Sequence, residues 1–286
     1  MSVELANAYW TSAGPVEVHF GREWSLFDFA ERCAQAAAAG FAGLGLWHAD
    51  IEHQLEQHSL EDMRRALDDN GVRCLELEFL GGWFLDEGDA ERKVADAQRR
   101  MLFETAAALD AHHIKAGNIG GPECEMARLK ESYAELVADA AQSCSAKVLY
   151  EFMPFDPNVN SIETALEVMD GVDNTGVVID TWHMSKLGIK PDDLREIPLD
   201  RLGWVELSDG QYENMEDTLD EVINRRKLPG EGEFDIRGYV EVARDMGYSE
   251  PWGVEVLSED LRALPIDEMY RRSYESAAAQ FEPVAA

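Results

Sequence analysis

A regular alternation of short apolar segments with longer segments of helical period runs along the chain. Parallel strands that helices cover on the outside are buried on both faces, so they read as short apolar runs rather than as alternating ones. Eight such runs, most of them ending in a polar residue, predict strands at residues 5–9, 43–47, 73–78, 114–117, 147–151, 176–180, 203–208 and 252–256.

The segments between these runs carry the signals of helix ends. Ser25 can cap the start of a helix that Gly40 ends, because a hydroxyl accepts from free backbone N–H groups and glycine adopts the left-handed conformation. Further helices are predicted at 59–71, at 90–111 and around 136–142.

The longest connection, about 209–234, follows the seventh strand, and long connections in compact domains are often functional. It has room for a short helix, and its Pro229, Gly230 and Gly232 predict a tight turn near the opening of the fold.

Eight strands with intervening helices in 286 residues favour a closed (β/α)₈ TIM barrel over an open doubly wound sheet. A GxGxxG fingerprint after a strand and a P-loop are both missing from the sequence, which disfavours a nucleotide-binding fold. We therefore expect one domain, a TIM barrel that spans residues 1–286.

Composition excludes several classes of function. No run of about 20 apolar residues is available to cross a membrane, and the N-terminal segment lacks the pattern of a secretory signal, so a cytoplasmic protein is expected. Cys33, Cys74, Cys124 and Cys144 show no CxxC spacing and are expected to be reduced. With 57 acidic against 25 basic residues, a net charge of -32 would repel nucleic acid.

Four predicted strands carry a carboxylate at or near their C-terminal end, namely Glu151, Asp180, Glu206 and Glu255. In a TIM barrel these strand ends and the loops after them form the active site, so the four side chains should converge. Clustered carboxylates repel one another and lose hydration, a conflict that a divalent cation resolves. Oxygen ligands favour manganese, with magnesium or calcium also compatible. Any one of the four could instead be an ordinary salt-bridged acid.

The segments EFMPF, VVIDTWH, WVELSDG, LPGEGEFD and GVEV together resemble the xylose-isomerase-like barrel superfamily, which includes sugar phosphate isomerases and epimerases. The resemblance covers nearly the whole chain and implies metal ligands at the ends of four successive strands: Glu151, Asp180, Glu206 and Glu255. Glu206 departs from the pattern, because many members carry His and some Gln at this position. An all-carboxylate set would bind a hard cation more tightly and lower its Lewis acidity.

The same resemblance implies roles for two basic residues. Glu151 would be an acid-base group as well as a metal ligand. His183 would shuttle a proton beside it, or would only orient a metal ligand. Arg226 would reach over the opening toward substrate oxygens, unless it belongs to a solvated basic turn with its neighbours Arg225 and Lys227.

Other candidates follow from their places at strand ends. Lys115 would face the opening, either to neutralise an anionic intermediate or to form an ion pair that closes the barrel core. His48 should face the opening as well. Trp10 and Trp182, like Trp47 and Trp83, could stack on a sugar or simply pack in the core. His112 and His113 precede the fourth strand, at the end of the barrel away from the chemistry.

These features predict a metal-dependent isomerase or epimerase that acts on a sugar or keto-polyol through a metal-stabilised enediolate. A lyase or dehydratase of the same fold is the alternative, since the resemblance extends to enzymes acting on 3-dehydroshikimate, keto-inositols or 3-keto-glycosides. A non-catalytic metal- or sugar-binding barrel is the alternative from another class. The expected partner is a small polyhydroxylated substrate, and a homo-oligomer or a second subunit that completes the site stays open.

Overall fold

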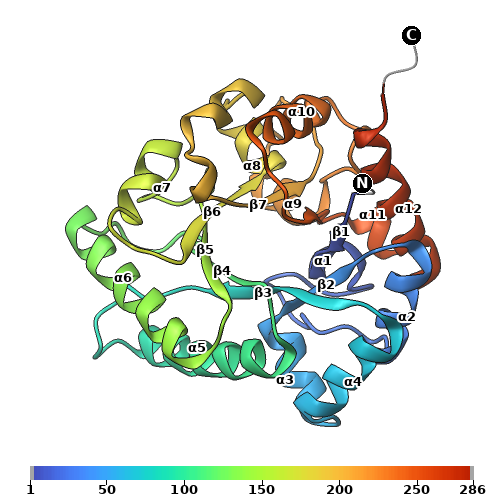
Figure 1. Cartoon of the computed structure of the whole chain (residues 1–286), viewed down its shortest axis with the longest axis horizontal. Coiled ribbons are helices and arrows are strands. Elements are labelled where there is room, and N and C mark those ends of the chain that lie inside the picture. The colour runs from blue at the N-terminus through green and yellow to red at the C-terminus, as the bar shows by residue number, and fades with distance from the viewer. Residues whose placement is uncertain (1–2, 284–286) are drawn as a thin grey trace.

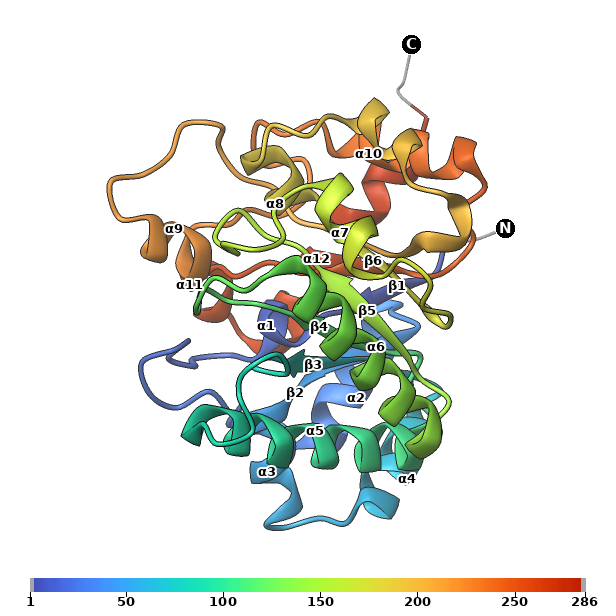
Figure 2. The ribbon, with the colours of Figure 1, turned by 90° about the vertical axis from the view of Figure 1, so that its left-hand side faces the viewer.

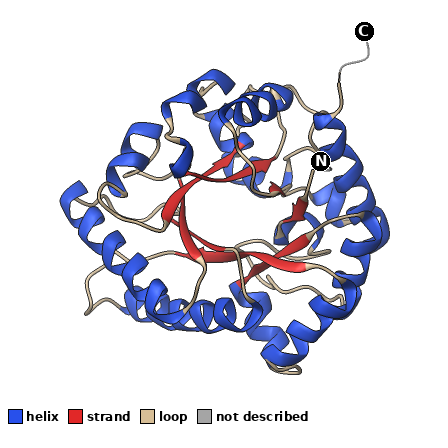
Figure 3. Cartoon of the chain, viewed as in Figure 1, coloured by secondary structure: helices blue, strands red, loops and turns tan. Residues whose placement is uncertain are grey.

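A closed ring of eight parallel strands, paired in the order β1 to β8, forms the centre of the molecule, and helices surround it (Figures 1 and 3). The computed structural model describes residues 3–283. The strands are β1 (Leu5–Asn7), β2 (Gly43–Trp47), β3 (Arg73–Leu80), β4 (His113–Gly117), β5 (Lys147–Glu151), β6 (Thr175–Asp180), β7 (Leu202–Leu207) and β8 (Trp252–Val254). The expected TIM barrel is confirmed, with strand ends shifted by one or two residues at most.

Twelve α-helices and three 3₁₀ helices are assigned within the described residues. The α-helices are α1 (Tyr9–Ser12), α2 (Phe29–Ala39), α3 (His48–Leu55), α4 (Leu60–Asn70), α5 (Ala90–Leu109), α6 (Met126–Ser143), α7 (Ile162–Val168), α8 (Thr181–Lys186), α9 (Thr218–Asn224), α10 (Ile236–Met246), α11 (Glu259–Arg262) and α12 (Ile266–Ala278). The 3₁₀ helices are η1 (Pro191–Glu196), η2 (Leu199–Arg201) and η3 (Ala279–Phe281). Between residues 3 and 283, no helix has the length and apolarity that a membrane span requires.

The helix ends follow the sequence signals with one correction. Asp28, not Ser25, caps α2, because its carboxylate accepts from the backbone N–H groups of Ala30 and Glu31. Ser25 instead accepts from Phe27 N in the turn before the helix. Gly40 ends α2 with φ 106°, as expected. The four cysteines are free, as expected.

Side chains fill the inside of the barrel as well as the layer between strands and helices. Ala6, Leu75, Leu149, Val178 and Trp204 form a small buried cluster of their own. Successive side chains of a strand point to opposite faces, so Glu206 shares the interior with Trp204, whose indole N–H donates to it at 3.1 Å. The carboxylate of β7 therefore lies directly against an apolar layer.

Two long segments project from one side of the barrel, the left-hand side in Figure 2, namely residues 13–28 and the connection from 209 to 234 that contains α9. The expected turn is present in the second segment. The Asp209 carboxylate accepts from the backbone N–H groups of Gly230, Gly232 and Phe234 at 2.9–3.1 Å and also from its neighbour Gly210. One buried side chain thus holds both ends of this connection together.

Candidate active site

The four carboxylates expected at the strand ends lie together inside the barrel. Glu151 ends β5, Asp180 ends β6, Glu206 lies in β7 and Glu255 follows β8. Each offers one oxygen to a group whose oxygens all lie within 4.8 Å of one another, and all four residues are buried. The strand arrangement therefore creates one oxygen-rich centre.

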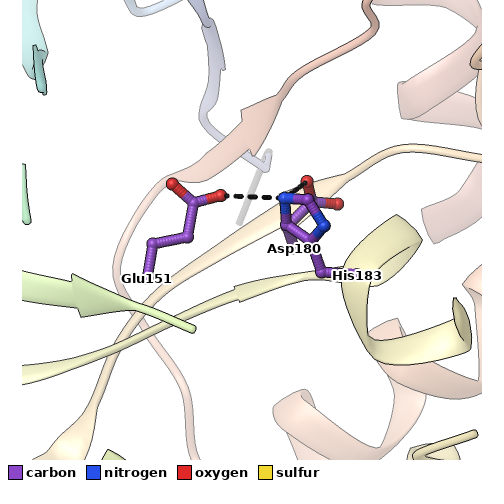
Figure 4. Close-up of side chains that lie close together, drawn as sticks. All are labelled: Glu151, Asp180 and His183. Atoms are coloured by element: carbon purple, nitrogen blue, oxygen red, sulfur yellow. Dashed lines mark ion pairs between the residues drawn. The ribbon is translucent and has the colours of Figure 1, made fainter. Parts of the chain in front are cut away.

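His183, in the first turn after β6, adds a nitrogen to this centre. Its Nε2 lies 3.5 Å from Glu151 Oε1 and 3.4 Å from Asp180 Oδ2, so one imidazole nitrogen reaches both carboxylates (Figure 4). The ring packs edge-on against Phe155 and Trp182, which fixes its orientation. His183 Nδ1 is buried and has no hydrogen-bond partner among the described residues.

Two cations compensate part of the negative charge. Arg226 Nη1 donates to Asp180 Oδ2 at 2.6 Å and to Glu255 Oε2 at 3.2 Å. Lys115, which is fully buried, donates to Glu206 Oε2 at 2.9 Å and to Glu255 Oε1 at 3.0 Å. Glu255 is therefore shared between both cations.

Two further acids complete the cluster. Glu76 Oε2 and Glu78 Oε2, two residues apart on the same face of β3, each lie 3.6 Å from Lys115 Nζ. Glycines in neighbouring strands make room for the buried acids. A Cβ on Gly45 would lie 2.6 Å from Glu76 Oε1, and one on Gly253 would lie 2.7 Å from Glu206 Cγ. The alternation along β3 was the signal in the sequence that could have placed both acids in the barrel interior.

The cluster holds more negative than positive charge. Burial, reinforced by neighbouring carboxylates, raises the pKa values of Glu76 and Glu78 well above their usual range, and burial raises the pKa of Glu206 to about 8 although Lys115 opposes the shift. Burial disfavours the charged Lys115, yet Glu151, Glu206 and Glu255 outweigh it and raise its pKa. In the protein without a metal ion, protonation of some of these acids therefore reduces the negative charge of the cluster.

The donor set fits a divalent cation. The four carboxylate oxygens lie within 4.8 Å of one another, and a nitrogen of His183 lies within the same distance of Glu151 and Asp180 oxygens. Among residues 3–283, His183 Nδ1, Glu76 Oε1 and Glu78 Oε1 are buried polar atoms without a hydrogen-bond partner. A bound cation would compensate the charge of these acids, some of which are otherwise neutralised by protonation. The oxygen-rich composition suits a hard ion, and the nitrogen of His183 is compatible with a borderline one such as zinc.

A cavity of about 620 Å³ opens onto this centre. Its wall includes Glu151, His183, Arg226 and Glu255, together with Trp10, Trp47 and Trp182. Asp180, Glu206 and Lys115 are buried and are not part of the wall. From the sequence, Lys115 was expected either to neutralise an anionic intermediate or to form an ion pair in the barrel core. In the structure its ammonium group forms ion pairs with Glu206 and Glu255.

The remaining candidates lie outside this cavity. His48 lines an adjoining cavity of about 330 Å³ and lies 3.3 Å from the Gln98 side chain. Trp83 packs in the core against Tyr133 and Tyr150. His113 belongs to β4, and both it and His112 pack against Trp204 and do not line the cavity. His113 Nε2 lies 3.6 Å from Glu76 Oε2.

Sequence reasoning missed one charged pair in the cavity wall. Lys186 of α8 donates to Glu221 of α9, and its ammonium lies 5.4 Å from the ring centroid of Trp182. Glu221 also accepts from Met215 N at 3.1 Å. The pair ties the long connection to the barrel, and nothing in the sequence pairs two residues 35 positions apart.

Comparisons with known proteins agree with this architecture. The sequence pattern of the xylose isomerase-like TIM barrel family matches residues 33–279. A 3-dehydroshikimate dehydratase from Pseudomonas aeruginosa is 28% identical over 245 residues, which cover 82% of this chain. An inosose isomerase from Halalkalibacterium halodurans is 23% identical over 225 residues, covering 76% of this chain and 78% of the relative. This chain spans only 37% of the length of the dehydratase.

The fold has a similar counterpart among solved structures. The crystal structure of the IOLI protein, described with a bound zinc atom, superposes with a TM-score of 0.79 at 18% identity and covers 97% of both chains. At this identity the likeness establishes the shared fold.

Proposed function

This chain belongs to the xylose isomerase-like TIM barrel family, and we propose that it is a divalent-metal-dependent isomerase or epimerase of a sugar or keto-polyol. One observation carries the proposal. Four carboxylate oxygens lie within 4.8 Å of one another beside a cavity of about 620 Å³ whose wall also holds a histidine and an arginine. Relatives that are isomerases and dehydratases support an enzymatic role of this kind.

Glu151, Asp180, Glu206 and Glu255 would hold the cation, with His183 beside them. When bound, a divalent cation polarises hydroxyl and carbonyl oxygens and stabilises negative charge that develops on them. Manganese is our first choice and magnesium the second, since most donors are carboxylate oxygens. The zinc in the crystal structure with the same fold makes zinc the third ion to test.

Glu151 and His183 are the proposed proton carriers. Both line the cavity, and their side chains lie 3.5 Å apart, so a proton taken from a substrate carbon can pass between them. Return of the proton to the same carbon from the other face gives an epimer, and return to the neighbouring carbon exchanges aldose and ketose.

Arg226, Trp10 and Trp182 are the proposed substrate-binding residues. The contacts of Arg226 with Asp180 and Glu255 hold its guanidinium at the cavity wall, where it can donate to substrate oxygens. The guanidinium carbon of Arg226 lies over the Trp182 ring, 4.9 Å from its centroid, in a cation–π contact. Lys115 acts from within the carboxylate cluster, where it lowers the negative charge.

A lyase of the same architecture is the second candidate. The match to 3-dehydroshikimate dehydratases favours it, because removal of the same proton followed by loss of a β-hydroxyl gives dehydration instead of isomerisation. A barrel that binds a metal or a sugar without turnover is the candidate from another class, and it would keep the cation while failing to exchange any substrate proton.

The test combines metal analysis with proton exchange. Purified protein is stripped with a chelator, reloaded with Mn²⁺, Mg²⁺ or Zn²⁺, and incubated in D₂O with an inosose, hydroxypyruvate and 3-dehydroshikimate. We expect deuterium incorporation that requires the ion; a product that differs from the substrate in mass only by the incorporated deuterium identifies an isomerase, and a product that has lost water identifies the lyase. Glu151→Gln should abolish exchange, while exposed Glu163→Gln on α7 serves as the matched control. Undiminished activity after thorough chelation would overturn the proposal.

A further inference from the structure

The cavity wall contains an apolar cluster that is separate from the barrel core. Its members include Trp10, Val18, Trp47, Phe79, Met153 and Leu257, which pack against one another and line the cavity. They lie in or just after five different strands and in the 13–28 segment, so they form a wall around the opening rather than a patch on one element.

The apolar surface continues outward to the rim. Phe20, Ile119 and Leu219 also line the cavity, yet they are 71%, 47% and 46% exposed. Phe20 and Ile119 lie in loops and Leu219 lies in α9, and Phe20 and Leu219 belong to the two segments that project on the same side in Figure 2. Large exposed apolar side chains gathered around one opening are typical of a binding surface.

The charged side chains of the wall fall into two groups. Glu78, Glu151, Arg226 and Glu255 belong to the carboxylate cluster with its cations. Lys186 and Glu221 bond to each other, which uses much of their capacity for hydrogen bonds. Hydroxyl groups of a ligand therefore find charged partners mainly at the cluster, and hydroxyls against the apolar wall would lose hydration without compensation.

The cavity is larger than a single polyol ring requires. Its volume of about 620 Å³ lies within the range of roughly 300–1,000 Å³ that drug-sized ligands occupy. A ring bound at the carboxylates leaves the apolar wall and the rim free for another part of the same molecule.

We propose that the substrate is a polyol that carries an aromatic or similarly flat apolar substituent, and that the wall around Trp47 and Phe79 with the rim of Phe20 and Leu219 binds this substituent. The inference rests on the proposed function for the position of the polyol part. A second copy of this chain covering the rim is the competing occupant, and the experiment distinguishes the two.

The experiment compares two probes that differ only in the apolar part. Dissociation constants of 4-nitrophenyl β-D-glucopyranoside and methyl β-D-glucopyranoside are measured by isothermal titration calorimetry on the Mn²⁺-loaded protein. Burial of one aromatic ring should favour the nitrophenyl compound by about 30-fold. A ratio below about threefold would overturn the inference.

Rim variants locate the effect. The double variant Phe20→Ser, Leu219→Ser should lower the preference by about fivefold, because it removes apolar area at exposed positions that folding does not need. Leu199→Ser is the matched control, since Leu199 is 48% exposed and is absent from the cavity wall. The double variant could instead keep the wild-type preference for the nitrophenyl compound and show a smaller apparent mass than the wild type on size-exclusion chromatography. That result would show that the rim binds a second copy of the chain, and it would contradict the inference.

The two proposals fail separately. A nitrophenyl preference that the rim variants reduce, without metal-dependent proton exchange on any substrate, supports the subsite and contradicts the proposed function. Metal-dependent exchange without that preference supports the proposed function and contradicts the subsite.

Discussion

Replacement of Lys115 by methionine tests how the protein balances charge inside the barrel. Lys115 is fully buried, and its Nζ lies 2.9 Å from Glu206, 3.0 Å from Glu255 and 3.6–3.8 Å from Glu76, Glu78 and Glu151. Methionine has a similar length and no charge, so the variant keeps most of the volume and removes the cation from five carboxylates.

The expected loss of stability is large in the absence of metal. Removal of one partner from a buried ion pair destabilises a protein by about 3–5 kcal/mol, because the remaining charge stays desolvated. Uptake of protons by the neighbouring acids offsets part of the loss, so we expect a decrease of about 3 kcal/mol in the free energy of unfolding. Urea denaturation of the chelated protein at pH 7.5 measures this decrease.

The same variant should bind a divalent cation more tightly. Lys115 and the cation would share Glu206 and Glu255, so the positive charges compete and repel across a few ångströms. We expect Mn²⁺ affinity to rise at least about tenfold, which corresponds to about 1.4 kcal/mol. Isothermal titration calorimetry on chelated protein measures the affinity. A loss of stability below about 1 kcal/mol, together with weaker Mn²⁺ binding, would refute the reasoning.

Three further predictions concern single side chains. Glu206→Gln should weaken Mn²⁺ binding by about 10–100-fold in calorimetry relative to exposed Glu163→Gln, and equal affinities would remove Glu206 from the ligand set. Burial lowers the pKa of His113 well below its usual range, so the folded protein holds it neutral while the unfolded chain takes up a proton below about pH 6.5. Stability is therefore lost as the pH falls through that value, and the wild type should lose about 1 kcal/mol more than His113→Gln between pH 6.5 and 5.5 in urea titrations; parallel slopes would contradict this. Asp209→Ala should cost about 2–4 kcal/mol in thermal unfolding, because several backbone N–H groups lose their acceptor, and a cost within about 0.5 kcal/mol would show that the turn holds without it.

Much of the fold follows from local pattern. Apolar runs such as 147–151 and 176–180 are strands because their residues suit burial on both faces, and the helices between them carry their own end signals. The cap of α2 shows the limit of such signals. Ser25 and Asp28 are both good capping residues, and only the path of the backbone decided for Asp28.

The sequence by itself determined which carboxylates could meet, because the carboxyl ends of parallel barrel strands always share one end of the fold. It singled out Glu151, Asp180, Glu206 and Glu255, and it left two roles open for Lys115. The ion pairs of Lys115 with these acids, and the apolar wall, were decided by tertiary structure. Contacts across a barrel depend on the stagger of its strands and on the course of its loops, and both are set only when the whole ring closes.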